Sequence, residues 1–557
     1  MKKRICSILL SGLMLTSMMP ISGCAPQAGS SDPNVLNVKI YEGGHGTEYI
    51  RLVADKFNEL YEGQYSVELL QPSTQLVGNT VYREIHSGSN ADVMTGSTLD
   101  ATDGLGRAGY GECFADITES VLNQPAIKFD GSLEDRTILE KLGDVKSDYV
   151  EKQSNGKWYL IPYVNGVGGM AVNTKVLSTY HLEIPKTTNE LFAAADYMME
   201  QAGGSTSKPK PFTYAATGNN YAFVAILNWL AQLGGEAEYR KFMTYTDNGR
   251  KMDLQECANL FKDNKTLSQV MELFVQLYDY NLQTTNVRSQ TFEQAQNQLM
   301  RGRCAFYFVG DWMFNEEYVR NANYLNDITL VQVPVASALG VKTFGADTKY
   351  KFSDELCEQI LCEIIDGVDA NLDSATIESN VETALSVQLD TEDVEKIIAA
   401  RGCTQDRSGA GMFINANSPK KELAALFLRF FASTECGEMV AENIHCASPY
   451  APGSLSNSQY KWIQSSSKMI SNQHNIPLSS QLSGHRKDIG SLALFPAMGE
   501  IPVVTLTDED HVVSIYDDAT YEKVGSMQIY KDKAAYFMNL NYEDALNCIR
   551  IGKWSIK

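Results

Sequence analysis

Hydrophobic and polar residues alternate at two different periods along the first hundred positions of the chain. Residues 35–41 alternate Leu, Val and Ile with Asn and Lys, which is typical of a half-buried strand. After a glycine-rich turn at 43–46, apolar residues recur at helical spacing over 50–61. Short apolar runs at 67–70 and 92–95 indicate two further strands. A strand, a turn and a helix followed by more strands predict an α/β sheet.

Similar signals mark elements further along the chain. The capping box at 187–190 predicts the start of a helix, and the apolar run 304–309 predicts a buried strand. Ser418-Pro419 predicts another helix start, with Ser as N-cap and Pro as the first helical residue. The stretch 342–402 differs because it is acidic and carries two helical patterns, the second of which should end at Gly402. We expect this stretch to be a helical insertion.

The chain is too long for one hydrophobic core. It has 557 residues, whereas a single core stops growing at roughly 250 to 300 residues. Two or more lobes must therefore share the burial, and a cleft between lobes is the default place for a ligand.

Charge and residue usage narrow the function classes. The chain has 47 Lys and Arg against 68 Asp and Glu, for a net charge of −21. Such an acidic field repels phosphate backbones and anionic lipids, which disfavours nucleic acid as a partner. The 11 cysteines form no C-x-x-C pair, and we expect most of them to be small buried residues. The seven histidines are scattered, so we expect no metal site and no cofactor.

The first residues have the pattern of a secretion signal. Three basic residues at 2–4 precede an apolar stretch at 5–21 and small residues at 22–23. The apolar stretch is too short and too interrupted for a membrane span, which needs about 20 apolar residues. We expect 1–23 to be a signal peptide and the small, polar stretch 24–34 to be a flexible tether.

The end of this signal also resembles the bacterial lipobox. The motif reads Ile-Ser-Gly-Cys and ends at Cys24. In a lipobox the cysteine thiol is acylated and becomes the first residue of the mature protein. Several acyl chains hold a protein to a bilayer far better than one, because each buried CH₂ contributes about 0.8 kcal/mol. Cys24 is therefore the expected lipid anchor.

Six segments occur in an order that resembles one protein family. They are the lipoprotein-type signal, the strand–turn–helix unit at 35–61, Ser-Gly-Ser-Asn-Ala-Asp-Val at 87–93, Asn-Gly-Lys-Trp-Tyr-Leu-Ile-Pro-Tyr at 155–163, Gly-Asp-Trp at 310–312, and Ile-Asn-Ala-Asn-Ser-Pro-Lys-Lys-Glu-Leu-Ala at 414–424. This order is similar to that of the family 1 extracellular solute-binding proteins of carbohydrate ABC importers, which include maltose-binding protein. The match covers roughly 35–335 and 409–442.

The resemblance implies a class II periplasmic-binding-protein fold, a Venus flytrap of two α/β lobes joined by three crossovers. It places lobe 1 at 35–155 and 307–408, with the acidic insertion at about 342–402, and lobe 2 at 156–306 and 409–557. It further implies a monomer without enzymatic activity, anchored by lipid to the outer face of the cell membrane. This protein would close on a sugar or oligosaccharide and deliver it to the permease subunits of an ABC importer.

A sugar site needs an aromatic plane together with carboxylates and amides, because sugars present C–H faces and hydroxyl rims. Trp312 beside Asp311 at a strand end is the expected main pair, the alternative being an interface Trp with a capping Asp. Carboxyl ends of strands are ligand-binding edges in open α/β sheets. Further candidates at strand ends, crossovers and one helix are Glu42, His45, Ser97, Tyr163, Asn165, Trp229, Met412 and Asn417. A tight turn at 42–46 and a core position for Trp229 are the structural alternatives.

One acidic loop has part of a calcium-binding pattern. Asp369, Asn371 and Asp373 put oxygen ligands at alternate positions. Ser374 and Asn380 stand where such a loop needs Gly and a bidentate Glu, which favours a solvated loop over a calcium site.

Two rival functions remain open at this point. The same fold could take a peptide, a polyamine or a metal, or could serve as a sensor that passes its sugar to a receptor. A secreted glycan hydrolase is less favoured, because the chain has neither G-x-S-x-G nor H-E-x-x-H.

Overall fold

The computed structural model describes most of the chain after the expected tether. The described residues are 29–72, 79–97, 113–143, 157–215, 221, 223–284, 287–406, 410–455, 457–479, 486, 489–490, 494–495 and 514–555. The expected signal peptide at 1–23, Cys24 and the tether up to 28 lie outside them.

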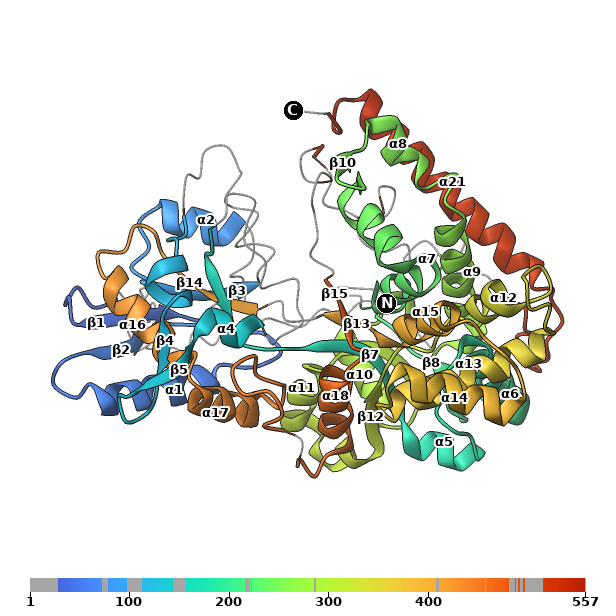
Figure 1. Ribbon diagram of the computed structural model, residues 1–557, viewed down its shortest axis with the longest axis horizontal. Coiled ribbons are helices and arrows are strands. Elements are labelled where there is room, and N and C mark those ends of the chain that lie inside the picture. Colours follow the sequence, from blue (N-terminus) through green and yellow to red (C-terminus); the bar gives the residue numbers. More distant parts are fainter. Residues whose placement is uncertain are drawn as a thin grey trace, which may run out of the picture.

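Two separate sheets, each with its own hydrophobic core, form two lobes that stand side by side (Figure 1). The sheet of lobe 1 has the order β2-β1-β3-β14-β6. Strand β1 is parallel to β2 and β3, whereas β14 is antiparallel to β3 and β6. The bounds are β1 Val35–Lys39, β2 Ser66–Leu69, β3 Val93–Ser97, β6 Leu160–Pro162 and β14 Ala410–Ile414.

The helices of lobe 1 bury the apolar stripes that their sequences carry. Helix α1 buries Tyr49, Ile50, Val53 and Phe57, which confirms the helix expected after the glycine-rich turn. The Phe57 ring meets rings of α16 edge to face. The remaining bounds are α1 Glu48–Leu60, α2 Asn79–His86, η2 Thr118–Leu122, β4 Pro125–Ile127, β5 Leu133–Thr137, α4 Ile138–Gly143, α16 Lys421–Phe431 and α17 Thr434–Ile444.

Strand β7 is the centre of the sheet of lobe 2. It pairs antiparallel with β11 on one edge and with β13 and β12 on the other. All seven residues of β7 and all seven of β11 are buried, as expected for strands covered on both faces. The order is β15-β13-β7-β11-β8, with bounds β7 Val167–Asn173, β8 Lys210–Phe212, β11 Cys304–Gly310, β12 Ile328–Val331, β13 Cys403–Asp406 and β15 Ile476–Ser479.

Helices surround this second sheet. Thr187 caps α6 by accepting a hydrogen bond from the Glu190 N–H, which confirms the expected helix start. Helix α7 is interrupted at Gly235, where the backbone dihedral angles are not helical. The bounds are α5 Thr174–Tyr180, α6 Thr188–Ala202, α7 Phe223–Thr244, β9 Thr246–Asp247, β10 Arg250–Lys251, α8 Leu254–Asn259, α9 Lys265–Leu277, η4 Tyr280–Leu282, η5 Val287–Ser289, α10 Phe292–Met300, α11 Met313–Asn321, η6 Ala322–Asp327, α18 Lys461–Ser471 and α21 Gln528–Arg550.

The acidic stretch is helical, as its pattern predicts, and belongs to lobe 2. It forms α12 Ala338–Phe344, α13 Asp354–Asp369, α14 Ser374–Leu385 and α15 Thr391–Gly402. Gly402 is the last residue of α15 rather than its left-handed cap. A Cβ atom there would lie 2.0 Å from the His474 carbonyl oxygen, so close backbone approach is what requires glycine.

The expected division of the chain between the lobes is wrong for 307–408 and for 409–450, whereas 460–555 lies in lobe 2 as expected. Strand pairing puts β11, β12 and β13 beside β7, and β14 beside β3. The described residues within 29–164 and 410–450 therefore form lobe 1, and those within 167–406 and 460–555 form lobe 2. The chain passes between the lobes after 164, between 406 and 410, and after 450, not at 306–307. A strand's apolar pattern is the same in either sheet, so only long-range pairing decides where it belongs.

Helix α16 also begins later than its sequence signal predicts. It starts at Lys421 rather than at Pro419. The Ser418 hydroxyl donates to the buried Asp92 carboxylate and accepts from the Lys420 N–H. Ser418 thus ties the approach to α16 to the start of β3, because a buried carboxylate is the stronger partner.

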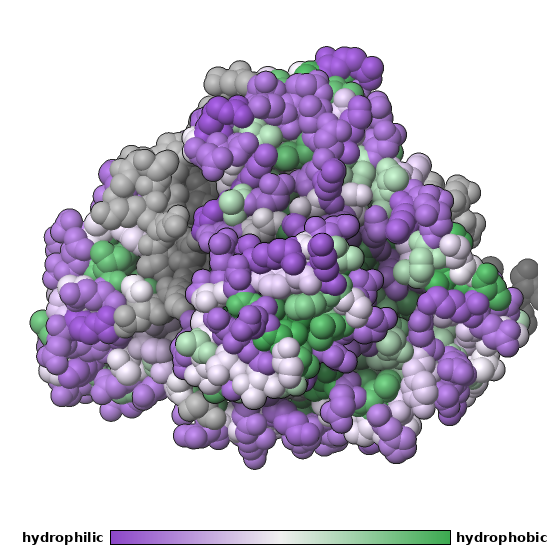
Figure 2. All heavy atoms as spheres, turned by 45° about the vertical axis from the view of Figure 1, so that its right-hand side comes forward, coloured by the Kyte–Doolittle hydropathy of each residue, from purple (hydrophilic) through white to green (hydrophobic). Residues whose placement is uncertain are grey.

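The surface and the cysteines agree with the composition. The face in Figure 2 is mainly hydrophilic, in keeping with the acidic excess. All nine described cysteines are free thiols, and eight of them are buried, as expected. Among the described helices, none combines the length and apolar character that crossing a membrane requires.

Replacing Gly402 by Ala tests the close approach of α15 to the loop before β15. We expect the Gly402→Ala variant to lose about 1 to 3 kcal/mol of unfolding free energy, because its Cβ would overlap the His474 carbonyl. Gly143→Ala is the matched control, since its Cβ would meet no atom within 4 Å. Urea unfolding of both variants measures the effect, and equal stability of the two would contradict it.

Candidate functional site

The two lobes touch where α11 begins. The Asn315 side-chain amide donates from Nδ2 to the Gly44 carbonyl oxygen over 2.8 Å. Its Oδ1 lies 3.4 Å from Nδ1 of His445, at the end of α17. One side chain of lobe 2 thus contacts two loops of lobe 1, and the Gly-Asp-Trp segment and the turn at 42–46 come together.

Gly44 leaves no room for a side chain at this contact. A Cβ atom on Gly44 would lie 2.9 Å from Cδ1 of Trp312 and 2.7 Å from Oε1 of Glu316. The turn therefore needs glycine so that its backbone can approach the indole ring and the carboxyl group.

The Trp312 ring is held by lobe 2 and faces lobe 1. Tyr221 meets it edge to face, with ring centroids 5.0 Å apart. A Cβ atom on Gly310 would lie 1.7 Å from the indole, so glycine lets the ring fold back over the end of β11. Trp312 is 8% exposed. An aromatic ring therefore stands at the contact between the lobes, and its role in binding remains a prediction.

The buried Asp311 side chain lies close to Cys446 of lobe 1. Burial and the nearby Asp311 carboxylate raise the pKa of Cys446 well above its ordinary value, so the thiol stays protonated. The backbone of Asp311 bonds to lobe 2, since its N–H donates to the Val167 carbonyl and its carbonyl accepts from the Trp462 indole.

His45 and Tyr163 meet edge to face on lobe 1. Their rings are nearly perpendicular at 5.9 Å, and Tyr163 stacks on Tyr49 at 4.9 Å. Burial lowers the pKa of His45 to about 4, so the imidazole is neutral at pH 7. Tyr163 was expected on lobe 2 but belongs to lobe 1, because β6 pairs with β14. Asn165 lies in the first crossing, where its N–H donates to the Ala447 carbonyl.

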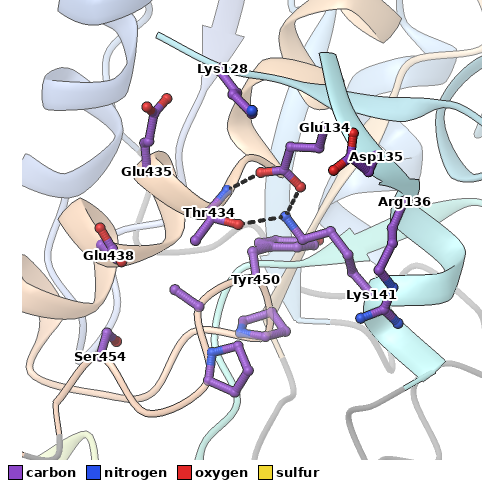
Figure 3. Close-up of a pocket in the computed structure, with 13 residues that line it drawn as sticks. Lys128, Glu134, Asp135, Arg136, Lys141, Thr434, Glu435, Glu438, Tyr450 and Ser454 are labelled. Atoms are coloured by element: carbon purple, nitrogen blue, oxygen red, sulfur yellow. Dashed lines mark hydrogen bonds and ion pairs between the residues drawn. The ribbon is translucent and has the colours of Figure 1, made fainter. Parts of the chain in front are cut away.

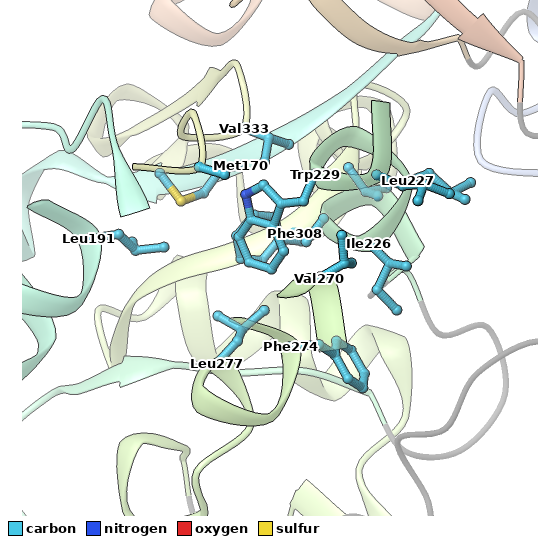
Figure 4. Packing of buried hydrophobic residues seen from close by; sticks show 14 of the residues in the cluster. Met170, Leu191, Ile226, Leu227, Trp229, Val270, Phe274, Leu277, Phe308 and Val333 are labelled. Carbon is cyan, nitrogen blue, oxygen red and sulfur yellow. The ribbon is translucent and has the colours of Figure 1, made fainter. Parts of the chain in front are cut away.

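Three expected site residues lie away from this contact. Trp229 is fully buried in the core of lobe 2, where its indole N–H donates to the Pro334 carbonyl (Figure 4). Met412 is buried in the core of lobe 1. Asn417 lies at the opposite edge of the lobe 1 sheet, because antiparallel pairing puts the end of β14 beside Val93 at the start of β3. Apolar spacing marks core faces more often than binding faces, and it does so here.

The structure gives less evidence on the binding roles expected for Glu42 and Ser97. The Glu42 side chain is exposed in the turn at 42–46. The backbone of Ser97 pairs with Ala410, and its side chain lies outside the described part of the chain.

The residues of the partial calcium pattern have separate protein partners. Asp369 forms a two-pronged ion pair with Arg401 at 2.7 and 2.8 Å. Asn371 accepts from the Gln473 N–H, and Asp373 caps α14. Within the described ranges no group of three or more His, Cys, Asp and Glu could hold a metal ion.

The contact contains residues that sequence reasoning missed, namely Asn315, Glu316, Tyr221, His445 and Cys446. Asn315 and Glu316 are three and four residues after Trp312 on a helix, a spacing that shares one face and could have indicated them. Glu316 accepts from the Gln296 amide over 2.6 Å, and burial raises its pKa to about 7. His445 and Cys446 had no local signal, since only the fold brings them to α11.

A charged surface pocket of about 540 Å³ lies elsewhere on lobe 1 (Figure 3). Lys141 crosses it and pairs with Glu134 at 2.5 Å, and Thr434 bonds to both side chains. The Lys141 ammonium and the Glu134 carboxylate pair with each other, so fewer of their hydrogen-bonding positions are left for an uncharged solute. The indole ring at the lobe contact is therefore the better candidate site.

Comparison with known proteins assigns this arrangement to a family. A family profile described as bacterial extracellular solute-binding protein matches residues 53–356. No curated protein sequence matches the chain.

Solved structures share the fold at low sequence identity. The GacH receptor of Streptomyces glaucescens, solved unliganded and with acarbose, is 13% identical, with a TM-score of 0.53 over 91% of this chain and 98% of that one. A probable secreted solute-binding lipoprotein from Streptomyces coelicolor is 13% identical, with a TM-score of 0.54 over 91% and 99%. A chitin oligosaccharide binding protein is 12% identical, with a TM-score of 0.51 over 91% and 99%. The profile match extends over more than half of the chain, and the chain therefore belongs to the bacterial extracellular solute-binding proteins.

Proposed function

We propose that this protein binds a sugar or oligosaccharide between its lobes and delivers it to an ABC importer. The observation that carries the proposal is the Trp312 ring, which is braced by Tyr221 and meets the turn at Gly44 where the lobes touch. An indole plane matches the C–H face of a sugar ring, and polar groups around it can bond to the sugar hydroxyls. The sugar ligands of GacH and of the chitin oligosaccharide binding protein support this choice of solute.

Binding would proceed by hinge closure without covalent chemistry. Three crossings join the lobes, so a rotation about them changes the contact at α11 while leaving each core intact. A solute that touches both lobes binds the closed form better, and this difference shifts the population toward closure.

Membrane attachment is a second part of the proposal. We infer that Cys24 is acylated and that residues after it tether a monomeric body outside the cell, where permease subunits would receive the solute. The basic, apolar and small residues before Cys24 and the extracellular character of the family support this placement.

The function is tested by calorimetry against a panel that includes acarbose, chitin oligosaccharides, maltotriose and short peptides. We expect a sugar to bind and to be recovered chemically unchanged by mass spectrometry. Binding of peptides but of no sugar, or turnover of the sugar, would overturn the proposal.

Trp312→Ala should weaken the affinity for the bound sugar by about 1 to 3 kcal/mol, because a stacking plane and its buried area are lost. Trp229→Phe is the control, since that ring lies in the core of lobe 2 away from the contact. Calorimetry on variants that keep the wild-type circular dichroism measures the change. Equal affinities of Trp312→Ala and the wild type would move the site elsewhere.

Gly44→Val should hold the lobes apart, because its side chain would overlap Trp312 and Glu316. We expect at least about tenfold weaker sugar binding, as for an overpacked contact, and a larger radius of gyration with sugar by X-ray scattering. Gly143→Val is the control at an open position. A compact, fully binding Gly44→Val protein would show that this contact does not form on closure.

Cys24→Ala should release the protein from the membrane, because no acyl chain would remain to hold it. Cell fractionation and labelling with radioactive palmitate measure the outcome in the natural host. Unchanged membrane association of the variant would refute the lipid anchor.

A further inference from the structure

The carboxyl group of Glu316 is covered from both lobes. Its Oε2 accepts a hydrogen bond from the Gln296 amide of α10 over 2.6 Å. Its Oε1 points at the turn of lobe 1, where a Cβ atom on Gly44 would stand 2.7 Å away. The Gly44 carbonyl itself accepts from Asn315. On the side that faces lobe 1, the Glu316 carboxyl group therefore lies against the uncharged backbone of Gly44 instead of water.

Charged side chains on α10 and α11 also shift the pKa of Glu316. The carboxylates of Glu293 on α10 and Glu317 on α11 oppose a negative charge on Glu316, whereas the Arg320 guanidinium favours one. Burial has the largest effect, and the pKa of Glu316 rises to about 7. Ionised Glu316 is thus disfavoured while the lobes touch.

The other titratable groups around Glu316 keep one charge state near neutral pH. Tyr307 on β11 and Cys446 on lobe 1 have pKa values well above their ordinary ones, because both are buried. His45 in the facing turn has its pKa lowered to about 4 by burial. Burial also lowers the pKa of His445, which lies 3.4 Å from Asn315. Glu316 differs from these groups because burial raises its pKa to about 7.

We propose that Glu316 is a positioning residue that couples solute capture to proton uptake, because the turn of lobe 1 covers its carboxyl group and thereby favours the neutral acid. The inference rests on the proposed closure of the lobes on a solute. When the lobes separate, water reaches the face of Glu316 that Gly44 covers, and the carboxyl group ionises more readily. Closure then takes up a proton, and the balance between open and closed forms depends on pH.

The direction of the effect follows from the raised pKa. A group whose pKa is higher in the closed form stabilises that form most at low pH, below the pKa of the open form. The advantage is lost as pH rises toward 7, the pKa of the closed form, and is absent above it. Solute affinity should therefore fall between about pH 5 and pH 7 and level off beyond.

The test compares the wild type with Glu316→Gln, which keeps the hydrogen-bonding shape without the charge. With the tightest-binding sugar of the panel, the wild type should lose about tenfold in affinity from pH 5 to pH 7.5, and Glu316→Gln should show no such slope. Glu293→Gln removes an exposed carboxylate from the neighbouring helix and should keep most of the wild-type slope. A flat wild-type profile, or the same slope in Glu316→Gln, overturns the inference.

Two measurements on the wild type keep the inference testable if Glu316→Gln does not fold. Calorimetry at pH 6 in buffers of different ionisation enthalpy should show net proton uptake on binding, and an uptake of zero contradicts the inference. If no sugar of the panel binds at any pH, the proposed function fails. The link between Glu316 protonation and lobe closure is then tested on the unliganded protein. Its radius of gyration should rise from pH 5 to pH 8, and a constant value overturns it.

Discussion

The pairing of β7 with strands from three distant parts of the chain is the constraint on which the rest of the structure depends. β11 lies along one edge of β7, and β13 and β12 along the other. The Asp311 N–H extends the pairing with β11 by donating to the Val167 carbonyl. This bond fixes the start of α11 beside the first crossing. Trp312, Asn315 and Glu316 reach lobe 1 because β7 holds the strand before them.

The contacts between the lobes differ in kind from those within lobe 2. Across the lobes, the Asn315 side chain forms hydrogen bonds with Gly44 and His445, and the edge of one indole ring meets the turn at Gly44. Hydrogen bonds of this kind contribute about 0.5 to 1.5 kcal/mol each, so water and solute can replace them. Within lobe 2, the C-terminal segment is fastened to buried Asp279 by the Tyr530 hydroxyl and the Ile515 N–H. Such a buried network rigidifies the lobe, which suits a body that moves as one piece.

Local features of the fold could be predicted from the sequence because each depends on neighbours in the chain. The strand at 35–39, the helix after the turn at 43–46 and the cap at Thr187 depend on alternation, helical spacing and a side chain within reach of its own backbone. Trp312 and the turn at 42–46 could be placed at strand ends for the same reason, and both stand at the lobe contact.

The remaining features were decided by partners far away in the chain. Apolar spacing shows that the face of the element carrying Trp229 or Met412 is buried, but not whether a core or a ligand covers that face. The pattern of β11 fits either sheet, and only its pairing with β7 puts it in lobe 2, as the pairings of β12 and β13 with β7 do for the residues after it. His445, Cys446 and Glu316 acquire their roles only when α11 meets the loops of lobe 1. Periodicity encodes the apolar face of each element, whereas tertiary packing selects what that face meets.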